Sequence, residues 1–496
     1  MIKKLVILLI VCFINISSAL AITEPQKYTI LDDFYKAMEK FKGSNVSVAY
    51  EDFSQILKAS PEDNDYINII LAGKLSDIGL YSLANKARVK IKDKEISQTP
   101  LKNIDEIYSQ TSAIEPEDEI YLSECFSDLT YNNMSKEVAT DLTANFQIRE
   151  KYDYAEYLTA LAWYKSGNLE QASEHINEAI SRNPKNVSYK YLYAKILADE
   201  GQKDKAFKIA ENIKKSVIMT DFYAKKYKEI EEYILYKNVK DEKLKKYHLA
   251  CYYYYRDDYL RSLKSIPTTN DKENKENSMI YALISQNYVA LKEYEKALSN
   301  AQKSYKLNKK NPNALILLGD LAYQKEDYRG ALKYYKDASK YDKTTYYADV
   351  KTAKASLKLG RNSKAKEILE KVLKNSSDSY EAYYLEASLE KYKELTYLKK
   401  SIGLNSEFAD GWLELANCER KKSNYKLAQV FLNNAYNLDQ NNYKYYYYQG
   451  LLYKNLKDKE NAVYYFKKCK SLNPKFTEVQ KELKRWQIQK RKIYWL

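Results

Sequence analysis

Pairs of small residues recur along this chain at a fixed separation, and this feature limits its possible folds more than any other. The two members of each pair lie twelve residues apart, and most successive pairs are displaced by 34 or 35 residues. Eight pairs share this register: Ala160 with Ala172, Ala194 with Ala206, Ala250 with Ser262, Ser285 with Ala297, Gly319 with Ala331, Ala353 with Ala365, Ala416 with Ala428, and Gly450 with Ala462. A repeat of this length indicates a solenoid of stacked supersecondary units.

The pattern is fullest between Trp412 and Pro474, where two consecutive copies alternate large and small apolar residues. The first copy contains Trp412, Leu415, Ala416, Tyr425, Ala428, Leu432 and Ala435, and the second Tyr446, Gly450, Tyr453, Ala462, Phe466 and Pro474. This pattern resembles the tetratricopeptide repeat (TPR), a helical hairpin with small residues where its two helices meet. The resemblance implies an all-α fold, a right-handed superhelical solenoid of antiparallel helix pairs.

Length and composition agree with a helical array. The chain has 496 residues but only 11 Gly and 8 Pro, few for a fold made of many turns and strands. A single compact core stops growing at roughly 250 to 300 residues, whereas a solenoid can be longer because each unit contacts only its neighbours.

We expect five segments along the chain. They are a signal peptide (1–21), degenerate helical hairpins (22–93), an irregular helical segment (94–152), the main TPR array (153–474) and a C-terminal capping helix (475–496). Two steps in the array exceed one period. They predict an extra helix near 221–239 and a shortened repeat near 379–408.

The first residues have the pattern of an export signal. Lys3 and Lys4 precede an apolar run over 5–14, and Ala19-Leu20-Ala21 forms a small-residue cleavage site. The apolar run is shorter than the roughly 20 residues that span a bilayer. We therefore expect cleavage after Ala21, a periplasmic or secreted protein, and no transmembrane helix after cleavage.

The sequence offers no recognisable catalytic, cofactor or metal motif. His175 and His248 are its only histidines, and no two glycines form a G-x-G motif. After cleavage four cysteines remain, Cys125, Cys251, Cys418 and Cys469, with none close in sequence to another. This spacing does not fit a zinc or redox motif, and it leaves their disulfide state open. We expect a protein without enzymatic activity and without cofactors.

The resemblance implies that a set of positions on the first helix of each repeat faces a concave groove. At these positions tyrosines alternate with basic residues, as is common at protein interfaces. The candidate partner-binding residues are Tyr154, Tyr157, Leu161, Tyr164, Lys165, Tyr191, Lys195, Tyr247, Tyr254, Tyr255, Tyr323, Tyr347, Lys354, Lys358, Asn417, Arg420, Lys421, Tyr447 and Lys454. A tyrosine-rich genome would also place tyrosines there, so their role in binding stays open at this point.

Charge and compartment narrow the classes of partner. Without the signal peptide the chain carries 80 basic and 67 acidic residues, a net charge of +13. Export from the cytoplasm argues against nucleic acid. We expect a scaffold of the cell envelope or secreted space that binds one or more protein partners in the groove. The alternative is a carbohydrate-binding protein whose aromatic groove holds an anionic glycan or cell-wall polymer.

Overall fold

Helices form all regular secondary structure in the part of the chain that the computed structural model describes, which is residues 30–43, 45–60, 65–92, 114–216, 221–268, 275–342 and 346–493. The expected signal peptide, 1–21, lies outside these residues. None of the described helices is long and apolar enough to cross a membrane.

The described residues divide into two compact units. The central unit comprises the described residues within 41–50 and 61–406, and the terminal unit comprises those within 30–40, 51–60 and 407–493. Helices α2 (Ile30–Lys42) and α3 (Val46–Ala59) contribute residues to both.

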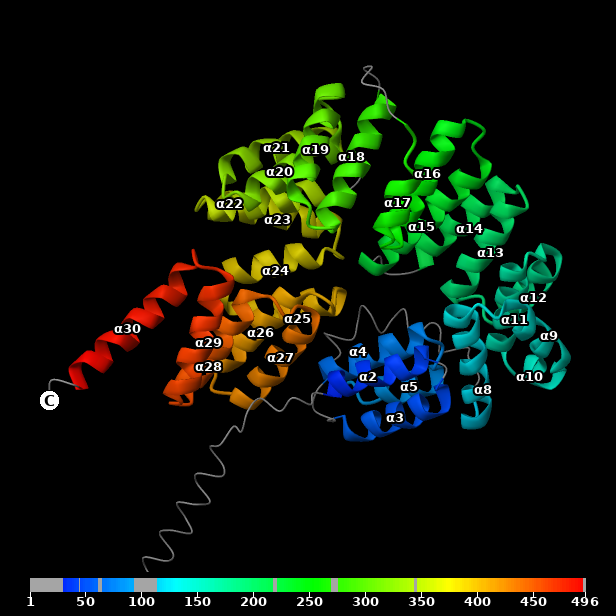
Figure 1. Cartoon of the computed structure of the whole chain (residues 1–496), viewed down its shortest axis with the longest axis horizontal. Helices are drawn as coiled ribbons and strands as arrows, with labels where there is room; N and C mark the ends of the chain where they lie inside the picture. The colour runs from blue at the N-terminus through cyan, green and yellow to red at the C-terminus, as the bar shows by residue number, and fades with distance from the viewer. Residues whose placement is uncertain are drawn as a thin grey trace, which may run out of the picture. The chain divides into compact units, whose positions relative to one another are not determined.

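The central unit is a series of helices packed mainly as sequential pairs (Figure 1). They are α4 (Asp65–Asp77), α5 (Tyr81–Arg88), α8 (Pro116–Ser127), the π-helix η1 (Asp128–Asn132), α9 (Ser135–Ala144), α10 (Phe146–Lys151), α11 (Asp153–Ser166), α12 (Leu169–Arg182), α13 (Val187–Asp199), α14 (Lys203–Ser216), α15 (Asp221–Asn238), α16 (Glu242–Tyr255), α17 (Tyr259–Ser265), α18 (Lys275–Ala290), α19 (Tyr294–Leu307), α20 (Pro312–Gln324), α21 (Tyr328–Tyr341), α22 (Tyr347–Lys358), α23 (Asn362–Asn375), α24 (Tyr380–Leu389), the 3-10 helix η2 (Lys391–Lys393) and α25 (Glu394–Leu404).

The terminal unit follows the same pairing. Its complete helices are α26 (Ala409–Lys421), α27 (Tyr425–Leu438), α28 (Tyr443–Asn455), α29 (Lys459–Leu472) and α30 (Thr477–Ile493). Helix α30 packs on α29, and Val479 is fully buried. The structure is therefore an all-α solenoid of antiparallel helix pairs.

The small residues of the recurring pairs lie where the two helices of a pair meet, and all of them are buried. A Cβ atom on Gly319 would lie 2.5 Å from the ring of Tyr335, and one on Gly450 would lie 2.6 Å from the ring of Phe466. Where the small residue is serine, its hydroxyl donates a hydrogen bond across the pair, as Ser285 does to the carbonyl oxygen of Ala297 at 2.8 Å. Close approach of the helices therefore explains the spacing of twelve.

All four described cysteines are buried and free. Burial raises the pKa of the Cys125 thiol and of the Cys469 thiol to about 12. A thiol is a poor nucleophile when its thiolate form is disfavoured. These side chains therefore act as small apolar core residues.

Candidate functional site

A cavity of about 520 Å³ opens in the central unit, on the face of α11 and α13. Seven of the residues expected in the groove line it: Tyr154, Tyr157, Leu161, Tyr164, Lys165, Tyr191 and Lys195. Their spacing explains why they meet, since residues three or four apart on a helix share one face. The first strong repeat and the next one thus form one continuous lining.

The cavity also has walls that the repeat pattern did not indicate. Helix α15 contributes Lys226, Glu229 and Tyr233, and Tyr252 and Arg256 lie on and just after α16. Further lining residues are Ser76, Asp77, Gly79, Tyr81, Phe126, Val187, Ser188 and Leu192. The spacing of Lys226, Glu229 and Tyr233 on one helical face was a signal in the sequence, but α15 lies outside the regular register.

Aromatic rings form the part of the lining on α11. The ring of Tyr157 stacks on that of Tyr189, with centroids 4.8 Å apart, and on that of Tyr154 at 6.0 Å. Tyr154 also meets the edge of Tyr81 at 4.9 Å. Tyr154 is only 1% exposed, so most of its ring belongs to the core. Tyr157 is less buried and is the more accessible of the two.

The hydroxyl of Tyr154 lies against Gly79. A Cβ atom on Gly79 would come within 1.8 Å of this oxygen, and Gly79 has φ of +80°. The hydroxyl is buried and has no hydrogen-bond partner among the described residues. The wall of the cavity at this point therefore depends on a residue without a side chain.

Tyr164 is held by a polar network at the other end of α11. Its hydroxyl donates to Oδ2 of Asp199 at 2.8 Å and lies 2.8 Å from the hydroxyl of Tyr233. Asp199 also pairs with Lys237 at 2.6 Å. Burial, together with the charge of Asp199, raises the pKa of Tyr164, so this phenol stays neutral.

Glu229 organises the cations of the cavity. Its carboxylate lies 2.9 Å from Nζ of Lys195, 3.0 Å from Nζ of Lys226 and 3.8 Å from the guanidinium of Arg256. Glu229 is 4% exposed. Burial alone would raise the pKa of this carboxyl, but Lys195 and Lys226 outweigh it and lower the pKa to about 2.

Lys165 lies beside this cluster without a carboxylate partner among the described residues. Its ammonium donates to the carbonyl oxygen of Leu129. Burial lowers the pKa of Lys165, and the nearby charges of Arg256 and Lys195 lower it further. The cavity therefore contains a positive charge that no residue of the described chain neutralises.

The other expected groove residues lie elsewhere. Tyr247, Tyr254 and Tyr255 pack around Cys251 and Leu283. In later repeats of the central unit, Lys354 lies 5.7 Å from the ring centroid of Tyr323, Tyr347 is 46% exposed, and Lys358 is exposed. None of these residues lines the cavity.

Asn417, Arg420, Lys421, Tyr447 and Lys454 belong to the terminal unit. Arg420 donates to the amide oxygens of Asn455 at 2.7 Å and Asn417 at 2.8 Å, and Lys454 pairs with Glu482 at 2.6 Å. These residues thus form a separate set within the terminal unit and do not line the cavity.

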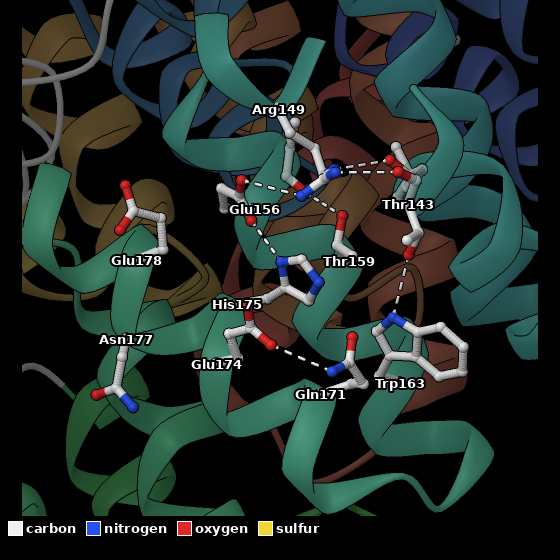
Figure 2. A network of polar contacts seen from close by, with 12 residues as sticks. Thr143, Arg149, Glu156, Thr159, Trp163, Gln171, Glu174, His175, Asn177 and Glu178 are labelled. Atoms are coloured by element: carbon white, nitrogen blue, oxygen red, sulfur yellow. Dashed lines mark hydrogen bonds and ion pairs between the residues drawn. The ribbon is translucent and has the colours of Figure 1, made fainter. Parts of the chain in front are cut away.

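A buried polar network on α10, α11 and α12 was the main candidate for chemistry outside the cavity (Figure 2). Oε2 of Glu156 lies 2.6 Å from Nδ1 of His175, and its Oε1 lies 3.5 Å from Arg149. Arg149 also donates to two backbone carbonyl oxygens, those of Leu142 and Thr143. Each group is thus engaged in joining helices.

The second histidine has a similar environment, since Nδ1 of His248 lies 2.7 Å from Glu232. Within the described ranges, no group of His, Cys, Asp and Glu could hold a metal ion. We therefore interpret both histidine pairs as structural.

Comparison with known families agrees with the repeat register. Models of the tetratricopeptide repeat match residues 157–213, 283–343, 347–379 and 443–476. The chain contains tetratricopeptide repeats. The first of these TPR matches begins at Tyr157 and includes most of α11 together with α12 and α13, so the main wall of the cavity is made from TPR helices.

Several solved structures align with parts or most of this chain. The APC/C hetero-tetramer Cut9-Hcn1 aligns with 90% of this chain and 95% of its own at 14% identity and a TM-score of 0.46. PilF of Pseudomonas aeruginosa aligns with 43% of this chain at 17% identity and a TM-score of 0.34. YrrB, described as a TPR protein with an unusual peptide-binding site, aligns with 46% at 16% identity and a TM-score of 0.23. These scores are too low to transfer a function. A search of curated proteins finds no significant match.

Proposed function

We propose that this protein is a non-enzymatic scaffold that binds a protein partner in the tyrosine- and lysine-lined cavity of its central unit. The observation that carries the proposal is the convergence of α11, α13, α15 and α16 on one hollow that combines ring faces with cations. Such surfaces give contact area at low conformational cost, because tyrosine has few rotatable bonds. TPR arrays generally serve protein interactions, which agrees with this assignment.

The proposal includes the cellular location. The sequence pattern over 1–21 supports export, so the partner would belong to the cell envelope or the secreted space. An anionic glycan or cell-wall polymer is the alternative ligand for the same aromatic lining.

The experiment compares three immobilised forms of the protein as baits for envelope extract: the wild type, Tyr157→Ala and Tyr193→Ala. Tyr193 is a matched control because it is also partly buried and packs on the same core, but it does not line the cavity. Thermal unfolding of all three forms checks that the fold is retained.

We expect defined proteins to bind to the wild type and to Tyr193→Ala, and to be lost from Tyr157→Ala. Equal recovery by all three baits would show that the cavity is not the binding site. Recovery of polysaccharide alone, released at about 0.3 M salt where charges are screened within a few ångströms, would favour the glycan alternative.

A further inference from the structure

The cavity of the central unit has an excess of positive charge. Four cations line it, Lys165, Lys195, Lys226 and Arg256, against the carboxylates of Asp77 and Glu229. Glu229 is already shared by three of these cations. The two carboxylates cannot neutralise all four cations.

Lys165 is the cation for which the cavity offers least compensation. Among the described residues, its ammonium donates to a backbone carbonyl oxygen and meets no carboxylate, and the nearby charges of Arg256 and Lys195 are repulsive. Partly desolvated like charges at short range are unfavourable, and an anion placed between them removes the penalty. The positions of these cations are thus mutually unfavourable, and a bound anion would relieve the repulsion.

The surroundings of this charge are apolar. Leu161, Leu192, Val187 and Phe126 line the same cavity beside the tyrosine rings. A ligand that satisfies both features must carry an anionic group next to an apolar or aromatic group. A cavity of about 520 Å³ admits a few residues of a peptide and lies within the usual range for a ligand site.

Helix α15 contributes to this arrangement from outside the regular repeat. It interrupts the 34-residue register, and it supplies both Glu229 and Lys226. Glu229 fixes Lys195 by an ion pair, while Lys195 also lies 5.5 Å and 5.4 Å from the ring centroids of Tyr233 and Tyr252. A cation held in this way is preorganised and loses little entropy when it binds an anion.

We propose that the cavity recognises an acidic segment of the protein partner, with one carboxylate bound between Lys165 and Arg256 and an adjacent apolar side chain against Leu161 and Leu192. This proposal rests on the proposed function and adds the chemistry of the ligand. A carboxylate accepts charge-assisted hydrogen bonds from ammonium and guanidinium groups, and these are stronger than neutral ones. The carboxylate can belong to a Glu or Asp side chain or to a chain terminus.

The test uses three short labelled peptides and fluorescence anisotropy with the purified protein at physiological salt. The first peptide alternates Glu with Leu and has both ends blocked. The second has Gln in place of every Glu. The third is the Gln peptide with a free C-terminal carboxylate. The protein variants are Lys165→Gln, which keeps a donor for the Leu129 carbonyl oxygen, and Lys309→Gln, an exposed control outside the cavity.

We expect the Glu peptide to bind more tightly than the Gln peptide, and Lys165→Gln to weaken the Glu peptide about tenfold, the size expected for one charge-assisted hydrogen bond. Lys309→Gln should leave the affinity for every peptide unchanged. Tighter binding of the third peptide than the second would assign the site to a terminal carboxylate, and tighter binding of the first alone to an acidic side chain.

Equal affinity for all three peptides, equal effects of the two variants, or binding of polygalacturonate but of no peptide would each overturn the proposal. The same variants distinguish a failure of this inference from a failure of the proposed function. If envelope proteins are lost from Tyr157→Ala but retained by Lys165→Gln, the cavity binds protein without the carboxylate contact, so the function stands and this inference falls.

Discussion

At the scale of single residues, two glycines that lie close together in the sequence, Gly73 and Gly79, have different surroundings in the structure. Gly79 has φ of +80° and touches Tyr154, whereas Gly73 lies within α4 and has no other atom within 4 Å of a Cβ position. The sequence places both near the same repeat, yet only the first contributes to the wall of the cavity.

Substituting the two glycines by alanine should therefore change stability in opposite directions. Gly79→Ala combines left-handed backbone with a clash against the Tyr154 hydroxyl, and we expect it to lower the free energy of unfolding by more than about 2 kcal/mol. Gly73→Ala should be neutral or raise it by up to about 1 kcal/mol, because alanine favours helix. Chemical denaturation of both variants measures this, and equal effects would contradict the contact with Tyr154.

At the scale of helices, charge is buried where α23, α24 and η2 pack. Glu386 on α24 is 2% exposed, and one of its oxygens has no hydrogen-bond partner among the described residues. Burial, with a smaller effect of Glu370 on α23 and of Glu390, raises its pKa to about 7, against the opposing charges of Lys366 and Lys393. Glu229 is similarly buried, but the cations around it lower the pKa of its carboxyl.

Glu386 should make the protein less stable as pH rises. Between about pH 4.5 and 7 the carboxyl is ionised in the unfolded chain but still protonated in the folded one, so the folded state binds more protons and its stability falls with increasing pH. Glu386→Gln should raise the free energy of unfolding by about 2 kcal/mol at pH 8 and have little effect at pH 4.

Unfolding measured at both pH values checks this, with the exposed Glu367→Gln as control. A variant that is stabilised equally at pH 4 and pH 8 would show that ionisation of Glu386 is not the cause.

At the scale of the whole molecule, the helix pairs within each compact unit pack mainly on the pairs that neighbour them in sequence. A substitution that weakens one helix pair should therefore lower the stability of that pair and its neighbours only. In a solenoid, stability is a sum of contributions from each repeat and from contacts between neighbouring repeats. This distinguishes a solenoid from a protein with a single globular core, where one overpacked residue lowers protection against amide exchange throughout the molecule.

Gly319→Ala provides the test, because the new Cβ would meet the ring of Tyr335 at 2.5 Å. We expect amide hydrogen exchange to accelerate by about tenfold or more in α20, α21 and the adjoining pairs, and to stay unchanged in α11 and α12. The double variant Gly319→Ala/Tyr335→Leu lacks the aromatic ring, so it should regain part of the protection against amide exchange that Gly319→Ala loses. The two substitutions are coupled because they act at one contact. Uniform acceleration along the chain would contradict the nearest-neighbour description.

The sequence by itself determined the helix pairs and which side chains share one face of a helix. These follow from local spacings: twelve residues bring two small side chains together across a hairpin, and helical periodicity places Tyr157, Leu161 and Tyr164 on one face of α11. The expected signal peptide stays a prediction.

Only the tertiary structure decided which of those residues form one site. Lys226, Glu229 and Arg256 join Lys165 and Lys195 because α15 and α16 pack against the face that α11 and α13 present. Whether each of these charges has a partner of opposite sign depends on distances between segments that are far apart in sequence. Such distances depend on how successive helix pairs are rotated against each other, and the spacing of residues in the sequence does not specify that rotation.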